Sequence, residues 1–214
     1  MNQDQWIALS EKLLAPTYKR FPIVIERGEG VRLWDVDGKE YMDFLAGISV
    51  VSLGHSHPDV TAVIREQASL LLHTSNLYHI PSQVLLAKRL TELSFADRAF
   101  FCNSGGEANE AAIKLARLYS HTRKNGGHEI ITFEGSFHGR TLATLSATGQ
   151  TKYHKGFEPL PEGFPKARFN DLNAVEEAIT DRTCAVMVEP IQAEGGIRVP
   201  DTGYLKGLRE MCNE

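Results

Sequence analysis

The sequence predicts an α/β fold in which helices cover both faces of a mainly parallel sheet, preceded by a small N-terminal lobe. From residue 98 onward, short apolar segments alternate with segments of helical periodicity, an order typical of parallel α/β sheets. Before residue 45, β-type segments lie close together around Asp37-Gly38, a dipeptide typical of hairpins. We therefore expect an N-terminal lobe over residues 1–60 and the first part of a larger domain over residues 61–214.

The N-terminal lobe is expected to contain one amphipathic helix followed by a β-meander. In chain order its elements are a helix at 1–14, strands at 23–25, 31–35 and 40–44, and a glycine-rich loop at 47–57. Apolar residues that recur among charged ones indicate the helix, and Gly28-Glu29-Gly30 indicates the turn between the first two strands.

The larger domain is expected to begin with two helices and then to alternate strands with helices. Helices are predicted at 58–72, 81–93, 107–121, 140–147, 173–179 and 204–211, strands at 99–102, 129–133 and 184–188, and a proline-rich loop at 151–166. The last strand is too apolar for an open sheet edge, and the chain stops after a helix where another strand is due. We therefore expect the sheet to be truncated.

The composition indicates a cytoplasmic protein and argues against several kinds of partner. The 214 residues carry a net charge of −4 and no basic run beyond pairs, so neither nucleic acid nor an anionic membrane is expected to bind. No apolar stretch approaches the roughly 20 residues of a membrane helix, and the N-terminus lacks the features of a secretion signal. Cys102, Cys184 and Cys212 are odd in number and far apart, which favours free thiols in a reducing compartment.

The segment Asn103-Ser104-Gly105-Gly106-Glu107 opens a predicted helix and suits a phosphate. The first amides of a helix lack partners, the helix dipole adds positive charge there, and glycines let an anion approach the backbone. The alternative is a helix cap without a ligand, because Ser104 and Glu107 have the spacing of a capping box. This segment alone does not decide between the two. It matches neither a P-loop nor a dinucleotide-binding fingerprint.

Two further polar clusters follow predicted strands, where parallel α/β enzymes place their ligand contacts. In the segment from Gly135 to Arg140, an aromatic ring suits stacking and a guanidinium suits a carboxylate; a plain turn with a surface arginine is the alternative. Glu189 follows the last apolar strand and either points into a site or pairs with a basic helix end. His55 and His57 suggest a metal, but no third ligand is nearby, so we expect none.

Together, these clusters and their order resemble the class III aminotransferases, and most of all their acetylornithine and succinylornithine branch. The resemblance runs from about residue 18 to residue 214. Its matching segments are Gly30–Asp35, Tyr41–Phe44, Leu53–Pro58, Phe101–Glu110, Phe137–Thr141 and Val188–Gln192. The resemblance implies the aspartate-aminotransferase-like fold, which is fold type I of the enzymes that use pyridoxal 5′-phosphate (PLP), and PLP as the cofactor.

The resemblance also implies a role for each matching residue. For the cofactor these are Ser104, Gly105 and Gly106 at the phosphate, Phe137 and His138 at the pyridine ring, and Glu189 near the ring. For the substrate they are Arg140 at the α-carboxylate, Glu194 as the partner of an active-site arginine that lies further along the family's sequence, and Tyr78 in a segment that approaches the partner subunit's site. Gly106 stands where alanine is commoner in the family, and this change keeps the backbone accessible.

The family's remaining catalytic residues lie in motifs that do not occur here. These are the Schiff-base lysine and the aspartate that pairs with the pyridinium nitrogen, and none of the ten lysines has the required context. The resemblance implies the N-terminal portion of a homodimeric enzyme of arginine biosynthesis. That enzyme transfers the amino group of N-acetylornithine, or of a related ω-amino donor, to 2-oxoglutarate. We expect this chain alone to be inactive.

Two alternatives stay open. One is a non-catalytic binding or dimerisation module that retains the front half of the family. The other is a fragment of a different class III enzyme, such as a 4-aminobutyrate aminotransferase or a glutamate-semialdehyde aminomutase. The sequence Phe-His-Gly-Arg that ends at Arg140 favours the acetylornithine branch.

Overall fold

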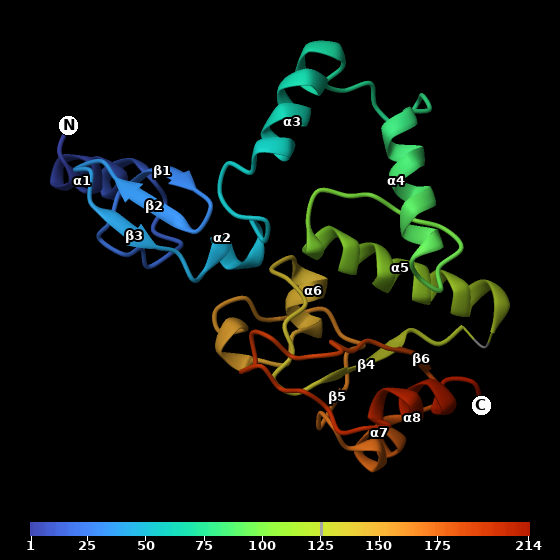
Figure 1. Cartoon of the computed structure of the whole chain (residues 1–214). Helices are drawn as coiled ribbons and strands as arrows, with labels where there is room; N and C mark the ends of the chain where they lie inside the picture. The colour runs from blue at the N-terminus through green and yellow to red at the C-terminus, as the bar shows by residue number, and fades with distance from the viewer. Residues whose placement is uncertain (125) are drawn as a thin grey trace. The chain divides into compact units, whose positions relative to one another are not determined.

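The computed structural model describes residues 1–124 and 126–214, which form two compact units, Met1–Val84 and Leu85–Glu214. The first unit contains helix α1 (Gln3–Leu13), strands β1 (Ile25–Glu29), β2 (Arg32–Asp35) and β3 (Glu40–Met42), and helices α2 (Ala46–Ser49) and α3 (Pro58–Leu70) (Figure 1). Helix α4 (Pro81–Glu92) crosses the boundary between the units. The domain boundary expected between residues 60 and 61 stays a prediction.

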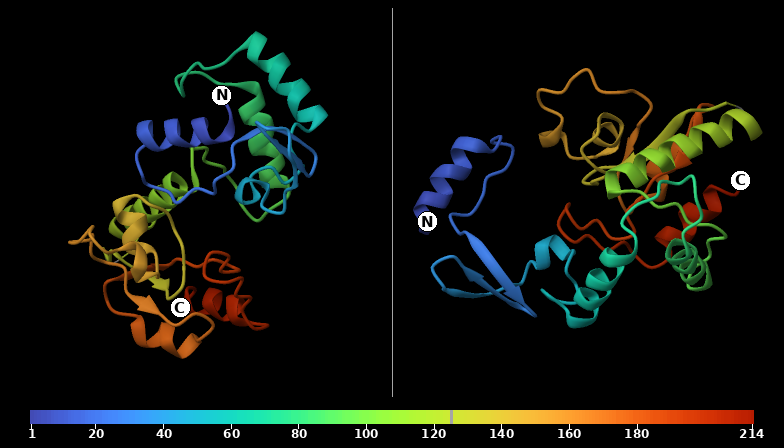
Figure 2. Two further views of the ribbon diagram at one scale, coloured as in Figure 1. Left: turned by 90° about the vertical axis from the view of Figure 1, so that its left-hand side faces the viewer. Right: turned by 90° about the horizontal axis from the view of Figure 1, so that it is seen from above.

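The second unit holds the alternating strands and helices. Its elements are α5 (Gly105–Arg123), β4 (Glu129–Phe133), α6 (Leu142–Ala147), the 3₁₀ helix η1 (Thr151–Tyr153), β5 (Lys166–Ala167), α7 (Leu172–Ala178), β6 (Thr183–Val186) and α8 (Tyr204–Met211). The right-hand view of Figure 2 shows the long helix α5 in yellow-green. No helix in the described ranges is both long enough and apolar enough to cross a membrane.

An antiparallel sheet in the order β1-β2-β3 organises the first unit, and its hairpin turns at Asp37-Gly38 as predicted. The buried carboxylate of Asp35 accepts hydrogen bonds from the amides of Asp37 and Lys39 at 3.1 and 2.8 Å. It also accepts a bond of 2.7 Å from the hydroxyl of Tyr41, which is the main reason why the pKa of Asp35 lies below its ordinary value. This carboxylate holds the turn closed.

The first strand differs from the prediction of a strand at 23–25. β1 runs from Ile25 to Glu29, so residues predicted as a turn are paired across the hairpin. Every residue of β1 except Gly28 is exposed, which explains why no apolar alternation marks the strand in the sequence. Gly28 suits its place because a Cβ there would lie 2.7 Å from Cγ of His55.

His55 fastens the loop that follows this sheet. Its Nε2 lies 2.6 Å from Oδ2 of Asp43, and its backbone exchanges two hydrogen bonds with Gly30. The bond to His55 is the main cause that lowers the pKa of Asp43. The same loop contains the short helix α2, which the sequence does not reveal because Gly47 and Ile48 have left-handed backbone angles.

Helices α3 and α4 confirm the predicted helices at 58–72 and 81–93. Pro58 occupies the first turn of α3, where its missing amide proton is not needed. Neither helix contains a buried residue. Large apolar side chains are therefore exposed on both, including Ile64 on α3 and Leu85 on α4.

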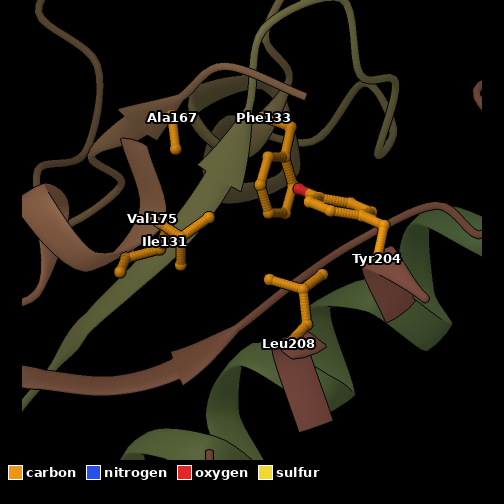
Figure 3. Packing of buried hydrophobic residues seen from close by; sticks show 6 residues of the cluster. All are labelled: Ile131, Phe133, Ala167, Val175, Tyr204 and Leu208. Atoms are coloured by element: carbon orange, nitrogen blue, oxygen red, sulfur yellow. The ribbon is translucent and has the colours of Figure 1, made fainter. Parts of the chain in front are cut away.

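A parallel sheet with β4 between β5 and β6 forms the centre of the second unit. Side chains of β4 alternate between its faces. Ile131 and Phe133 are fully buried against α7 and α8, and Figure 3 shows Tyr204 and Leu208 of α8 beside them. Ile130 joins a second cluster with α5 and α6. Helices therefore cover both faces of a parallel sheet, as the sequence predicts.

Three elements of the second unit differ from the prediction. Residues 99–102 form no strand, because no described strand offers their backbone a ladder of hydrogen bonds. The sequence does not predict β5, because a strand of two residues is too short to show an alternating pattern. Helix α6 begins at Leu142 rather than at residue 140, because Thr141 is its N-cap and donates from its amide to Oγ1 of Thr144 at 3.1 Å.

Candidate active site

Helix α5 begins with the cap that its sequence predicts. Ser104 is the N-cap residue, and its Oγ accepts a hydrogen bond of 3.2 Å from the amide of Glu107. The carboxylate of Glu107 turns back and accepts from the amide of Asn103 at 2.6 Å. Because the cap uses the hydroxyl oxygen as an acceptor, the hydroxyl proton of Ser104 stays available to a ligand. The cap and an anion site are therefore compatible.

Two amides at the start of α5, those of Gly105 and Gly106, have no acceptor within the described part of the chain. The next two amides along the helix are satisfied by Ser104. A Cβ at Gly105 would meet no atom within 4 Å, so the approach to this backbone is open. Free amides at the positive end of a 19-residue helix, beside a hydroxyl proton, fit an anion such as phosphate.

The loop that follows β4 lies directly against this helix end. A Cβ on Gly139 would lie 3.1 Å from Cα of Gly106, so the absence of a side chain lets the two backbones meet. The side chain of Asn109 on α5 donates a hydrogen bond of 2.7 Å to the carbonyl oxygen of His138. These contacts place the segment from Phe137 to Arg140 beside the free amides of α5.

Glu189 joins the segment after β6 to the loop after β4. Its Oε1 accepts a hydrogen bond of 2.7 Å from the amide of Phe137. Burial raises the pKa of Glu189, although the amides that it accepts from oppose this effect. Because β4 and β6 are parallel neighbours, the clusters that follow them meet at one edge of the sheet.

Arg140 lies over two aromatic rings on the exposed side of the site. Its guanidinium carbon is 4.2 Å from the ring centroid of Tyr153 and 5.5 Å from that of Phe137. These rings meet edge to face, with centroids 6.0 Å apart. The hydroxyl of Tyr153 donates a hydrogen bond of 2.6 Å to Oε1 of Glu194. Arg140 is exposed and forms no ion pair within residues 1–124 and 126–214, so its charge is free for a carboxylate ligand.

His138 differs from its neighbours because its imidazole is buried, with 4 % of its surface exposed. Burial lowers the pKa of His138 to about 4, and the charge of Lys166 adds to this effect, so the ring is neutral at pH 7. Its Nε2 has no hydrogen-bond partner among the described residues, while its backbone amide donates to Oγ1 of Thr148 at 2.9 Å. A contact of His138 with the cofactor stays a prediction.

Lys166 on β5 secures the short helix that follows the loop. Its Nζ donates to the carbonyl oxygens of Ser146, Ala147 and Phe164 at 2.6, 3.0 and 3.2 Å, and to Oγ1 of Thr132 at 2.8 Å. Burial lowers the pKa of Lys166 to about 8. The ammonium group lies at the C-terminal end of α6, where the helix dipole is negative, and so stabilises that end of the helix.

The structure brings the predicted site residues of the second unit together around the start of α5 and the loop after β4. Tyr78 is the exception, because it lies in the first unit, where 68 % of its surface is exposed. Its assignment to a partner subunit's site stays a prediction.

Two residues of this region, Tyr153 and Lys166, were missed by sequence reasoning. Tyr153 contacts Glu194 across 41 positions of sequence, and Lys166 contacts Thr132 across 34. Both lie in the proline-rich loop predicted at 151–166, where a tyrosine or a lysine is an ordinary surface residue. Only the fold shows that they contact residues of this region.

Three comparisons with known proteins can be set beside this geometry. The family model for class-III aminotransferases matches residues 13–214. Among curated proteins, the acetylornithine aminotransferase of Methanocaldococcus jannaschii is 54% identical over 215 residues, and that of Myxococcus xanthus is 50% identical over 212 residues. These alignments cover 100% and 99% of this chain but 54% and 53% of the relatives. The chain therefore spans about half the length of the curated relatives it matches.

Solved structures show the same likeness and the same partial coverage. The ornithine aminotransferase of Toxoplasma gondii has a TM-score of 0.94 at 34% identity, covering 100% of this chain and 51% of that one. A second structure of that enzyme, with a TM-score of 0.93 at 35% identity and coverage of 99% and 51%, has partial occupancy of PLP at its active site. The acetylornithine aminotransferase of Elizabethkingia anophelis has a TM-score of 0.82 at 35% identity, covering 100% and 51%.

Proposed function

Because this chain belongs to the class-III aminotransferases, we propose that the whole protein is an acetylornithine aminotransferase of arginine biosynthesis. It transfers the amino group of N-acetylornithine to 2-oxoglutarate, and this chain forms the N-terminal half. The family and fold type I agree with the sequence-based prediction, and PLP is the cofactor of the family. The chain alone is inactive in this proposal, because the lysine and the aspartate that complete the family's site belong to the rest of the protein.

The start of α5 is the proposed binding site for the PLP phosphate. The free amides of Gly105 and Gly106 and the hydroxyl proton of Ser104 support this assignment, because they converge at a helix N-terminus. When bound, PLP supplies an electron sink for the negative charge that develops on the substrate carbon. The contribution of this chain is to bind the cofactor and to orient it.

Phe137 is the proposed stacking partner of the cofactor ring. The hydrogen bond from its amide to Glu189 supports this role, because it fixes the backbone that carries the aromatic side chain. The same hydrogen bond supports a position of Glu189 near the ring. His138 supports the same loop with a neutral, buried imidazole, which adds no charge to the site at pH 7.

Arg140 is the proposed anchor for the α-carboxylate of the substrate. A guanidinium group binds a carboxylate through two parallel hydrogen bonds, and the in-plane donors of Arg140 are free of ion pairs within the described ranges. Glu194 contributes to the substrate side of the same site.

A homodimer in the cytoplasm is also proposed for the whole protein. The exposed apolar side chains of α3 and α4 support an interface, because such surfaces are normally covered. Tyr78 in this arrangement reaches the partner subunit's site. The free cysteines of the chain suit a reducing compartment.

One observation carries the proposal, namely the close approach of the backbones at Gly106 and Gly139. It supports the proposal that an anion site and a carboxylate site lie side by side. The cofactor can therefore be held by its phosphate at α5 while the carboxylate of a neighbouring substrate is held by Arg140. Neither cluster alone distinguishes an aminotransferase from a capped helix and a surface turn.

The test measures glutamate formation by the whole protein with PLP and 2-oxoglutarate, using N-acetylornithine, ornithine and 4-aminobutyrate as competing amino donors. We expect the highest kcat/KM for N-acetylornithine. Arg140→Gln is expected to raise the KM for 2-oxoglutarate by about tenfold or more, since a charge-assisted pair is lost. The matched control is Arg168→Gln, which removes an exposed guanidinium paired with Asp171. A preference for 4-aminobutyrate, or equal effects of the two substitutions, would contradict the proposal.

A further inference from the structure

Arg140 and Glu194 carry opposite charges on the exposed side of the same site, yet they form no ion pair within the described residues. One side chain, Tyr153, contacts both of them. The ring of Tyr153 holds the guanidinium group at 4.2 Å, and its hydroxyl holds the carboxylate at 2.6 Å. The ring of Phe137 meets Tyr153 edge to face and limits its movement. The face of one phenol thus contacts the cation, and its hydroxyl contacts the anion.

We propose that Tyr153 is a positioning residue that keeps Arg140 from pairing with Glu194, so that the guanidinium group remains open to a substrate carboxylate. The inference rests on the proposed function of Arg140 and adds the residue that maintains its availability.

The physical reason lies in how a guanidinium group uses its donors. All five N–H groups of arginine lie in one plane, and an aromatic ring attracts the cation through its face. Tyr153 therefore holds Arg140 without occupying the donors that a carboxylate needs. A glutamate would do the opposite, because a bidentate pair with Glu194 would occupy the same N–H groups. The substrate would then have to displace the side chain before it could bind.

The hydroxyl of Tyr153 restrains Glu194 in a complementary way. The bond from the phenol occupies Oε1 of the glutamate and fixes its direction. Loss of the hydroxyl alone frees the carboxylate, while loss of the ring also frees the guanidinium group. The two parts of the side chain can therefore be tested separately, with Tyr153→Phe and Tyr153→Leu.

The experiment measures the Kd of glutarate, an unreactive dicarboxylate, for the PLP-loaded whole protein by calorimetry. Tyr153→Leu is expected to raise the Kd by about tenfold, and Tyr153→Phe by about threefold. Each substitution is repeated in the Glu194→Gln background, where this carboxylate cannot compete for Arg140. That background also removes the partner implied for the second arginine, so each Kd is compared only with the Kd of Glu194→Gln alone. There we expect the rise to fall to about twofold or less, as in a double-mutant cycle between coupled residues. Tyr119→Leu, at an exposed position on α5, is the matched control and is expected to leave the Kd unchanged.

Two results would overturn the inference. One is an effect of Tyr153→Leu that is equally large with Glu194 and with glutamine at that position, because Tyr153 would then act only by packing. The other is an unchanged Kd in Tyr153→Phe and Tyr153→Leu. If Tyr153→Leu fails to fold, as judged by circular dichroism, the Tyr153→Phe pair decides the outcome. Turnover of the unsubstituted enzyme is a separate measurement, so failure of the proposed function is recognised independently of this one.

Discussion

His138→Gln is expected to remove much of the acid sensitivity of this chain. The pKa of His138 falls from its ordinary value of 6.5 to about 4 in the folded state, because burial disfavours the charged ring. As the pH falls, His138 therefore binds a proton at a higher pH in the unfolded chain than in the folded chain. The contribution of the neutral His138 to the free energy of unfolding is complete above pH 6.5. It decreases as the pH falls from 6.5 toward 4, and it does not change further below pH 4. One pKa unit corresponds to about 1.4 kcal/mol, so the difference between 6.5 and about 4 sets an upper limit of about 3.5 kcal/mol.

The buried position of the imidazole leaves most of this effect in place, so we expect a loss of roughly 2–3 kcal/mol between pH 6.5 and 4. Glutamine has a similar volume and does not titrate. The two tryptophans, Trp6 and Trp34, lie in the first unit, so urea unfolding is followed by circular dichroism and by hydrogen exchange of β4.

The measured quantity in this experiment is the slope of unfolding free energy against pH, not its absolute value. A buried glutamine lowers absolute stability through its unsatisfied amide, and this loss does not depend on pH. Glu189 and the other carboxyl groups titrate in both proteins, so their contributions cancel in the comparison. His121→Gln removes an exposed imidazole from α5 and is the control for the loss of one histidine. The same acid slope in the His138 variant as in the unsubstituted chain would refute the reasoning.

Two further predictions concern the contact between α5 and the loop after β4. Ser104→Ala removes the acceptor of the helix cap and is expected to lower the free energy of unfolding by about 1 kcal/mol. It should also weaken the binding of PLP to the chain more than that of pyridoxal; fluorescence titration that finds equal weakening contradicts the phosphate assignment. Gly139→Ala places a Cβ 2.6 Å from Oγ1 of Thr144 and 3.1 Å from Cα of Gly106, at a φ of +137°, and is expected to cost about 2–4 kcal/mol in urea unfolding. Gly156→Ala has a φ of +88° but meets no atom within 4 Å, so a loss as large as that of Gly139→Ala would exclude the steric contact as the cause.

Elements with a local physical signal were predicted well from the sequence. Pro58 marks the start of α3, Asp37-Gly38 marks the hairpin, and the apolar run of β4 marks the central strand. The errors at residues 99–102 and at β5 have a common cause, which is that a strand depends on its neighbours. Residues 99–102 are apolar enough for a strand but have no partner among the described strands, and the two residues of β5 are paired without any pattern of their own.

The candidate site also combines local contacts, which the sequence predicts, with long-range contacts, which it does not. Ser104 and Glu107 lie three residues apart, so their hydrogen bond follows from the sequence of one helix end. The meeting of Gly106 with Gly139 does not, because it depends on how a loop packs against a helix. Tyr153 has no signal at all, since its importance comes from the charges that surround it after folding. Long-range contacts of this kind are properties of the assembled sheet and not of any segment.

The hydrogen bonds of Lys166 also make helix α6 depend on a strand that follows it in the chain. Helix α6 has six residues, far fewer than the roughly 12 needed for marginal stability in isolation, so it depends on outside support. Its last carbonyl oxygens receive that support from Lys166 on β5, and β5 is paired with β4. The stability of this short helix is therefore coupled to the pairing of the central strands. A substitution that weakens the pairing of β5 with β4 should also loosen α6 and the loop that ends at Arg140 before it.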